Sequence, residues 1–276
     1  MADETKHEDS LDSFIEKLSA VAQEFFAIGE VDVPVLHFLK DDAIGVLPLI
    51  PVKGLEPAQM ARLVVGFYDP PIAAVLAEGW ATNLALPKDI NEALDGKRPW
   101  SEVAERARKR LAPTLCHYPA LAEPLRTGDT AALATKHRAA LTYAWHDDTM
   151  GPVVRDGKSL KSLPTHLRRK IMTLFGEDRD GRSRTLLWSI EQQDGRDGRR
   201  RFVPESLDGA SEYASRWRPL YIALEMAARA KVPTAFVRLR VRELCREQLR
   251  PYQLVENINF MDMGNFFDAP APPYMQ

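Results

Sequence analysis

Three apolar runs of strand length constrain the fold of this chain more than any other feature. They span residues 33–39 (VPVLHFL), 43–50 (AIGVLPLI) and 72–80 (IAAVLAEGW). Each is far shorter than the ~20 residues that a membrane-spanning helix needs, and short apolar runs between turn residues are typical of buried strands. Only three charged residues divide the first two runs, which predicts a β-hairpin.

Helical patterns flank these runs. Ser10 can cap a helix over residues 11–27, whose apolar side chains recur at helical spacing and which Gly29 ends. Pro57 suits the first turn of a second helix that runs to about Phe67. The opening block is therefore predicted as αββαβ, a sheet with helices on one face.

The rest of the chain has a helical pattern first and a strand pattern after it. The middle is predicted as a mainly helical insertion or lobe, and then a β-hairpin is predicted from TLLWSIEQ (185–192) and RRFVPE (200–205) around an Asp-Gly-rich loop. The helical segments expected in the middle are 88–95, 100–111, 129–146 and 162–175. The predicted divisions are a disordered 1–10, the αββαβ block 11–86, the helical part 87–183, a hairpin with helices 184–250, and a tail 251–276.

The fold class expected from these elements is α+β, with an antiparallel or mixed sheet of about five strands. A chain of 276 residues with 45% apolar and 28% charged residues suits one large domain or two closely joined ones. Cys116 and Cys245 are too few for a disulfide framework, and the acidic N-terminus does not resemble a secretory signal. A cytoplasmic location and no membrane contact are expected.

Charge is divided unevenly along the chain. The net charge is −8 over residues 1–150, +9 over 151–250 and −3 over 251–276, and 18 of the 22 bases in the middle block are arginines. One interpretation is that this basic block docks on the chain's own acidic part or is solvated. The other is that it meets an anionic partner such as nucleic acid, because arginine binds phosphate and carboxylate in a bidentate manner.

Arginines gather at three places in the basic block. One place is Arg168, Arg169 and Lys170, and a second is the segment 237–250, which reads as a helix or, at its start, as a strand. The third has the fewest acidic neighbours, so it is the strongest candidate for anion or nucleic-acid contact. It is the hairpin loop with Arg196, Arg199, Arg200 and Arg201.

The tail combines three acids with many aromatic and sulfur side chains, which a disordered linker would lack. Such a segment needs a groove to lie in, so it either packs on its own domain, exchanges with a sister subunit or docks on another protein. The side chains expected to carry a partner contact are Phe260, Met263, Phe266, Phe267 and Tyr274.

A possible catalytic pattern lies in the helical part. His117 is followed by the pair His146 and Asp147 at the end of an apolar helix. This pattern resembles the HD phosphohydrolases, and the resemblance implies a divalent metal held by these three residues and a metal-activated water. The alternative is an ordinary helix C-terminus, with His146 beside the helix dipole and a turn beginning at Asp147.

Two polar residues interrupt the predicted strands. Glu78 is either a carboxylate of raised pKa beside Trp80 or the partner of water or an arginine, and His37 is expected to be a satisfied sheet residue. The opening block, with its strand ending in Glu78-x-Trp80, also resembles small uncharacterised bacterial and phage proteins, a resemblance that implies no activity.

These features together favour a non-catalytic binding or assembly protein of phage or mobile-element type, which is expected to need no cofactor and to form oligomers or bind a protein through its tail. A metal phosphohydrolase and a nucleic-acid accessory protein are the alternatives.

Overall fold

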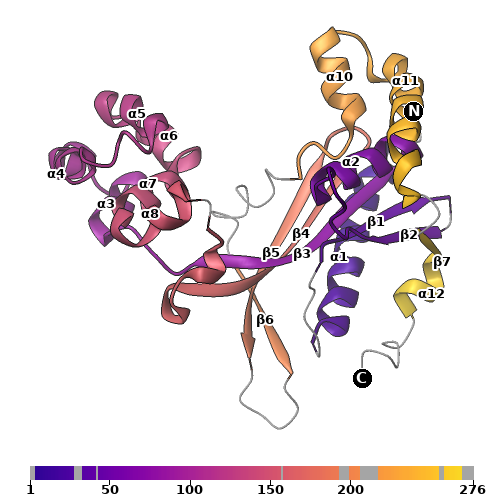
Figure 1. Cartoon of the computed structure of the whole chain (residues 1–276), viewed down its shortest axis with the longest axis horizontal. Coiled ribbons are helices and arrows are strands. Elements are labelled where there is room, and N and C mark those ends of the chain that lie inside the picture. Colours follow the sequence, from indigo (N-terminus) through magenta and orange to yellow (C-terminus); the bar gives the residue numbers. More distant parts are fainter. Residues whose placement is uncertain are drawn as a thin grey trace. The chain divides into compact units, whose positions relative to one another are not determined.

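The chain folds into two compact units, Met1–Gly79 with Lys170–Gln276 and Trp80–Arg169. The chain leaves the first unit within one strand, β3, and returns within another, β4 (Figure 1). The computed structural model describes residues 4–27, 33–41, 43–156, 158–192, 199–205, 217–254 and 258–268.

A seven-stranded sheet organises the first unit, with the strand order β6-β5-β4-β3-β1-β2-β7. The predicted α+β class is confirmed, and the strand count exceeds the expected five. The two opening runs form an antiparallel hairpin in which Phe38 pairs with Gly45. The strands are β1 (Val35–Lys40), β2 (Ala43–Pro48), β3 (Ile72–Thr82), β4 (Arg168–Asp178), β5 (Ser183–Gln192), β6 (Arg200–Pro204) and β7 (Asn259–Asp262).

Strand β4 occupies much of the segment that was expected to be helical, so the prediction of a helix over 162–175 is wrong. Both faces of β4 are covered, and every residue from Ile171 to Asp178 is buried. A strand buried on both faces loses the alternation of apolar and polar residues, and its apolar run then resembles a buried helix.

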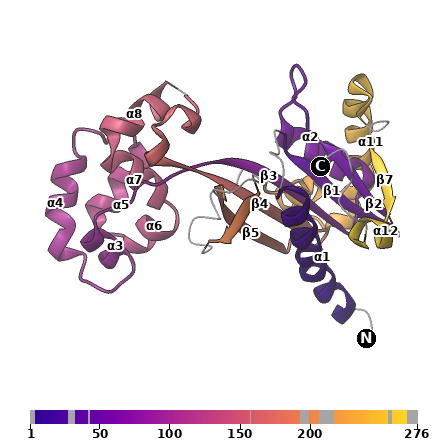
Figure 2. The same ribbon diagram turned by 90° about the horizontal axis from the view of Figure 1, so that it is seen from below.

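Helices cover both faces of the sheet, which corrects the expectation of helices on one face (Figures 1 and 2). Side chains alternate along β3, so Ala73 and Val75 join one core while Ile72 and Ala74 join the other. One core contains α2 (Pro57–Tyr68), α10 (Ile222–Ala230) and α11 (Thr234–Leu249), and the other contains α1 (Glu4–Phe25) and α12 (Met263–Asp268).

Element boundaries follow local chemistry. Pro57 opens α2 as expected, and the left-handed Asp69 (φ 47°) ends it before Pro70. Helix α1 begins at Glu4, ahead of the expected start at residue 11. The ambiguity over 237–250 resolves as helix, because α11 buries Val241, Cys245 and Leu249, which recur at intervals of four.

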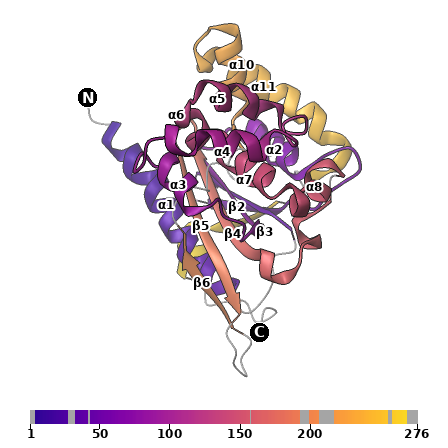
Figure 3. The same ribbon diagram turned by 90° about the vertical axis from the view of Figure 1, so that its left-hand side faces the viewer.

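The second unit is a helical bundle (Figure 3). It has its own core, formed by side chains between Leu86 and Ala144. The expected helix over 129–146 is divided in two near Lys136. Its helices are α3 (Lys88–Leu94), α4 (Ser101–Leu111), α5 (Ala122–Thr127), α6 (Thr130–Thr135), α7 (Arg138–Trp145) and α8 (Asp147–Arg155), with short 3-10 turns at Pro119–Leu121, Leu160–Ser162 and Thr165–Leu167.

None of the helices that the structure describes combines the length and the apolar character required to cross a lipid bilayer.

Candidate functional site

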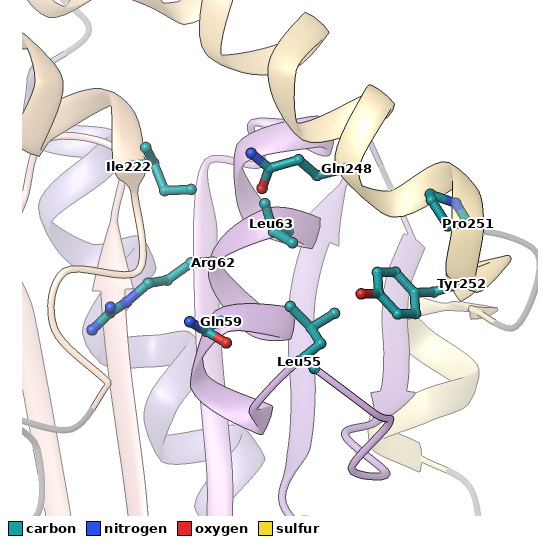
Figure 4. Close-up of a pocket in the computed structure, with 9 residues that line it drawn as sticks. Leu55, Gln59, Arg62, Leu63, Ile222, Gln248, Pro251 and Tyr252 are labelled. Atoms are coloured by element: carbon teal, nitrogen blue, oxygen red, sulfur yellow. The ribbon is translucent and has the colours of Figure 1, made fainter.

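A pocket of about 480 Å³ opens in the first unit, between α2 and the end of α11 (Figure 4). We call it the α2–α11 pocket. Its floor comes from α2 and the loop before it, and its far wall from the end of α11 and the 3-10 turn Arg250–Tyr252. The residues that line it are Gly54, Leu55, Gln59, Arg62, Leu63, Ile222, Gln248, Pro251 and Tyr252.

The first turn of α2 fixes one polar group of the pocket. The backbone N–H of Glu56 donates a hydrogen bond of 3.1 Å to Oε1 of Gln59. A glutamine at this position satisfies an N–H that a helix start otherwise leaves free. The amide of Gln59 is therefore held at the pocket floor with its NH₂ group as the remaining donor.

Close packing of α2 against α11 sets the separation of the two walls. Gly66 lies where α11 approaches, and a Cβ at this position would stand 2.6 Å from Sγ of Cys245. Burial raises the pKa of the Cys245 thiol to about 11, so this side chain is a neutral packing group. At the far end of α2, Asp69 lies 3.4 Å from the guanidinium of Arg238 and further ties the helices together.

The segment before α10 places Ile222 at the third wall. The backbone N–H of Leu220 donates to the carboxylate of Glu177 at 2.5 Å, and the hydroxyl of Tyr221 donates to the carbonyl of Pro70 at 3.0 Å. Burial raises the pKa of Glu177. Arg62 contributes as well, because its Nη2 donates to the carbonyl of Arg218 at 2.8 Å.

The pocket lining is mostly apolar, and Arg62 is its one charged residue. Figure 4 shows the guanidinium of Arg62 directed away from Tyr252, so mainly its stem borders the cavity. The Tyr252 hydroxyl points towards Leu55, and the Gln248 amide projects from α11. None of the nine lining residues is an acid, histidine, cysteine, serine or lysine. Such a lining offers hydrogen bonds and apolar contact.

The residues of the predicted metal site belong to the second unit, and two of them, His146 and Asp147, have other partners. His117 is exposed. Nε2 of His146 lies 2.9 Å from the carbonyl of Ala85, and Asp147 begins α8 and pairs with Arg155 at 2.7 Å. Among the residues that the structure describes, no three His, Cys, Asp or Glu side chains are placed to hold a metal ion.

The first arginine cluster is also engaged within the second unit. The guanidinium of Arg168 lies over the ring of Trp80, 4.5 Å from its centroid. Arg169 donates to the carbonyl of Thr82 at 3.0 Å and to Oδ1 of Asn83 at 3.1 Å. Both groups therefore help to hold the two strand ends that enter and leave this unit.

The hairpin arginines differ from one another. Arg200 forms a buried ion pair with Glu78 at 2.5 Å, with the two side chains only 6% and 7% exposed. The expectation that Glu78 could meet an arginine is confirmed. Arg199 and Arg201 are exposed, whereas Arg196 lies outside the described residues.

The described part of the tail packs on its own unit. Strand β7 pairs with β2, and α12 buries Phe266 beside His37 (ring centroids 5.9 Å apart), with the ring of Phe267 6.3 Å from that of Phe14. Phe260 and Met263 remain 40% and 37% exposed. Tyr274 lies outside the described residues.

Sequence reasoning did not identify the pocket. Gln59 and Gln248 lie almost 190 residues apart and carry no motif, and Tyr252 follows a basic helix. The one available signal was the Pro57 helix start with Gln59 in its first turn, which predicts a capping residue rather than a site.

Comparison with protein-family models, with curated proteins and with solved structures found no match for this chain.

Proposed function

We propose that this chain is a non-catalytic binding protein whose α2–α11 pocket holds an aliphatic side chain and the neighbouring amide groups of a peptide from a protein partner. The proposal rests on the composition of the pocket lining. Two carboxamides and a phenol stand beside Leu55, Leu63 and Ile222, without an ionised acid among them.

The polar groups suit peptide bonds. A glutamine side chain has an NH₂ donor and a carbonyl acceptor, and a peptide group has an N–H donor and a C=O acceptor. The two groups can therefore hydrogen-bond to each other. Gln59 and Gln248 come from different helices, which gives two separate contact points along an extended segment. A cationic ligand is disfavoured, because Arg62 is the one charged residue of the lining and its charge is positive.

The apolar groups suit an aliphatic side chain. The pocket volume of about 480 Å³ lies within the range of small-ligand pockets, which are mostly apolar with a few placed polar groups. Burying a leucine-sized side chain contributes about 1.5–3 kcal/mol, enough to anchor a weak peptide contact.

The proposal is tested with N-acetyl-leucinamide, the smallest probe with one aliphatic side chain between two amides. Titration followed by ¹H–¹⁵N NMR is expected to shift the backbone signals of Leu55, Gln59, Gln248 and Tyr252. N-acetyl-glycinamide, which lacks the side chain, is the ligand control and is expected to leave them in place. Equal responses to both probes, or shifts confined to other regions, contradict the proposal.

A matched pair of variants sharpens the test. Tyr252→Phe removes one hydroxyl from the pocket and is expected to weaken binding of the leucine probe about fivefold, as the loss of a net hydrogen bond of about 1 kcal/mol implies. Tyr68→Phe removes a hydroxyl elsewhere on the same unit and is expected to leave the affinity unchanged.

A further inference from the structure

Two aromatic rings of the first unit hold the ammonium group of a lysine. Nζ of Lys40, the last residue of β1, lies 4.9 Å from the ring centroid of Tyr68 and 5.2 Å from that of Phe260. Both distances lie within the ~6 Å at which the face of a ring attracts a cation. No salt bridge joins Lys40 to another of the residues that the structure describes. The attraction of this position for a cation therefore comes mainly from the two rings.

The two rings are fixed by packing that does not involve Lys40. Tyr68 ends α2 and Phe260 lies in β7, and their centroids are 5.7 Å apart with the ring planes at 67°. The buried ring of Phe38 supports both, at 5.1 Å from Tyr68 and 5.8 Å from Phe260. Gly45 leaves room for this ring, because a Cβ there would stand 2.4 Å from Cζ of Phe38. The two walls of the site are therefore preorganised.

The site is open to water and shares its face of the sheet with an acid. Phe260 is 40% exposed, and Lys40 is exposed as well. Lys40 pairs with Ala43, which in turn pairs with Asp262, so the lysine and the acid lie on the same face. A carboxylate on this face adds to the attraction for a cation.

We propose that Tyr68 and Phe260 form a binding site for a quaternary ammonium group, and that Lys40 competes for this site from within the chain. The ammonium of Lys40 has three N–H donors and is strongly hydrated, so contact with ring faces costs it hydrogen bonds to water. A quaternary ammonium has no N–H to satisfy and is attracted by the rings in the same way. It therefore gains more from the site than the lysine does, and the flexible side chain of Lys40 can give way to it.

Titration of the full chain with choline, followed by ¹H–¹⁵N NMR at constant ionic strength, tests the site. Choline is expected to shift the backbone signals of Lys40, Tyr68 and Phe260, with a Kd on the order of 1–10 mM for two ring contacts. The control is 3,3-dimethylbutan-1-ol, which has the same shape without the charge and is expected to leave these signals in place. Equal shifts with both probes, or choline shifts confined to other regions, overturn the proposal.

Variants with opposite effects separate the ring walls from the competing lysine. Lys40→Ala is expected to bind choline about fivefold more tightly and Phe260→Leu about fivefold more weakly, because a cation–ring contact of about 1 kcal/mol corresponds to this factor. Lys53→Ala and Phe236→Leu, which change exposed residues of the same types elsewhere in the first unit, are the matched controls and are expected to keep the wild-type affinity. An unchanged affinity in Lys40→Ala or in Phe260→Leu overturns the proposal.

A second probe distinguishes two sources of the same chemical group. The trimethylated form of N-acetyl-lysinamide represents a modified side chain of a protein, and choline represents a small solute. Tighter binding of one assigns the group to that source, and failure of both to bind overturns the proposal. The site does not depend on the proposed function, since none of its residues lines the α2–α11 pocket. Phe260→Leu is expected to keep its affinity for the leucine probe, so the two proposals fail separately.

Discussion

Buried ionisable side chains show how single residues hold this fold. The Glu78–Arg200 ion pair joins β3 to the outer hairpin strand β6, and Glu177 accepts the backbone N–H of Leu220. A buried charge that loses its partner costs about 3–5 kcal/mol, so each group here tolerates little change. Both contacts join residues that lie far apart in the sequence, so no local sequence pattern predicts them.

His37 makes the stability of the protein depend on pH. Burial lowers its pKa from 6.5 to about 4, since the ring lies in the core beside Phe266. The imidazole is neutral in the folded and unfolded chain above pH 6.5. As pH falls below that value, the unfolded chain takes up a proton that the folded chain refuses until about pH 4. The free energy of unfolding therefore decreases by about 3 kcal/mol as the pH falls from 6.5 to about 4.

Urea denaturation at several pH values between 7.5 and 4 measures this effect. His37→Leu is expected to lose the part of the pH dependence that falls between 6.5 and 4, because no imidazole remains to titrate. His166→Gln removes an exposed imidazole and is expected to keep the wild-type dependence. The prediction is contradicted if the free energy of unfolding depends on pH in the same way for the wild type and for His37→Leu.

The elements that could be predicted from sequence are those with one-sided or well-punctuated patterns. The hairpin at residues 33–50 and the helix from Pro57 carry turn and cap signals, and both are confirmed. Strand β4 has apolar residues on both faces and β7 has only four residues, so periodicity identified neither. The pocket arises from packing between α2 and α11, which is a long-range contact without a sequence motif.

Gly66 is expected to control the spacing of α2 and α11. Gly66→Ala improves helix propensity by about 1 kcal/mol but places a methyl group against Sγ of Cys245, and overpacking of this kind costs about 1–3 kcal/mol. A net loss of about 1 kcal/mol in unfolding free energy is expected, together with weaker probe binding. Gly79→Ala, where the nearest side chain atom is 4.0 Å away, is the control and is expected to be nearly neutral.

A second variant tests the cause. Cys245→Ala removes the sulfur that the added methyl meets, so the double variant with Gly66→Ala is expected to destabilise the chain by less than the sum of the two single changes. Additive losses count against a direct clash.

At the scale of the whole molecule, part of the uneven charge along the sequence is paired within the first unit. Arginines of the basic block pair with acids of the N-terminal half within the first unit, as Arg184 does with Asp12 and Glu16, and Arg200 with Glu78. This arrangement supports the interpretation in which the basic part docks on the chain's own acidic part. Nucleic-acid binding through exposed residues such as Arg199 and Arg201 stays a prediction.

The helical unit is expected to be dispensable for the folding of the first unit. Each core draws its side chains from one unit, and the N–H of Asn83 donates to the carbonyl of Leu167 at 2.9 Å, so the two ends of the helical unit lie side by side. Replacing residues 84–166 by a short Gly-rich turn is expected to leave a cooperatively unfolding protein that binds the leucine probe. Circular dichroism and urea denaturation measure the outcome.

The control for that replacement is a chain ending at residue 258. It keeps the helical unit but lacks β7 and α12, and is expected to lose cooperative unfolding of the first unit, because Phe266 leaves its core. The prediction is contradicted if the chain ending at residue 258 unfolds cooperatively while the chain with residues 84–166 replaced does not fold.

The pairing of β2 with β7 also sets an order of events on the ribosome. Ala43 pairs with Asp262, so one edge of the sheet is completed by a strand that is translated about 220 residues after β2. At about 5–20 residues per second, the nascent β2 waits roughly 10–40 s for its neighbour. During that interval β2 presents an unpaired strand edge, which is the kind of surface that can pair with strands of other nascent chains.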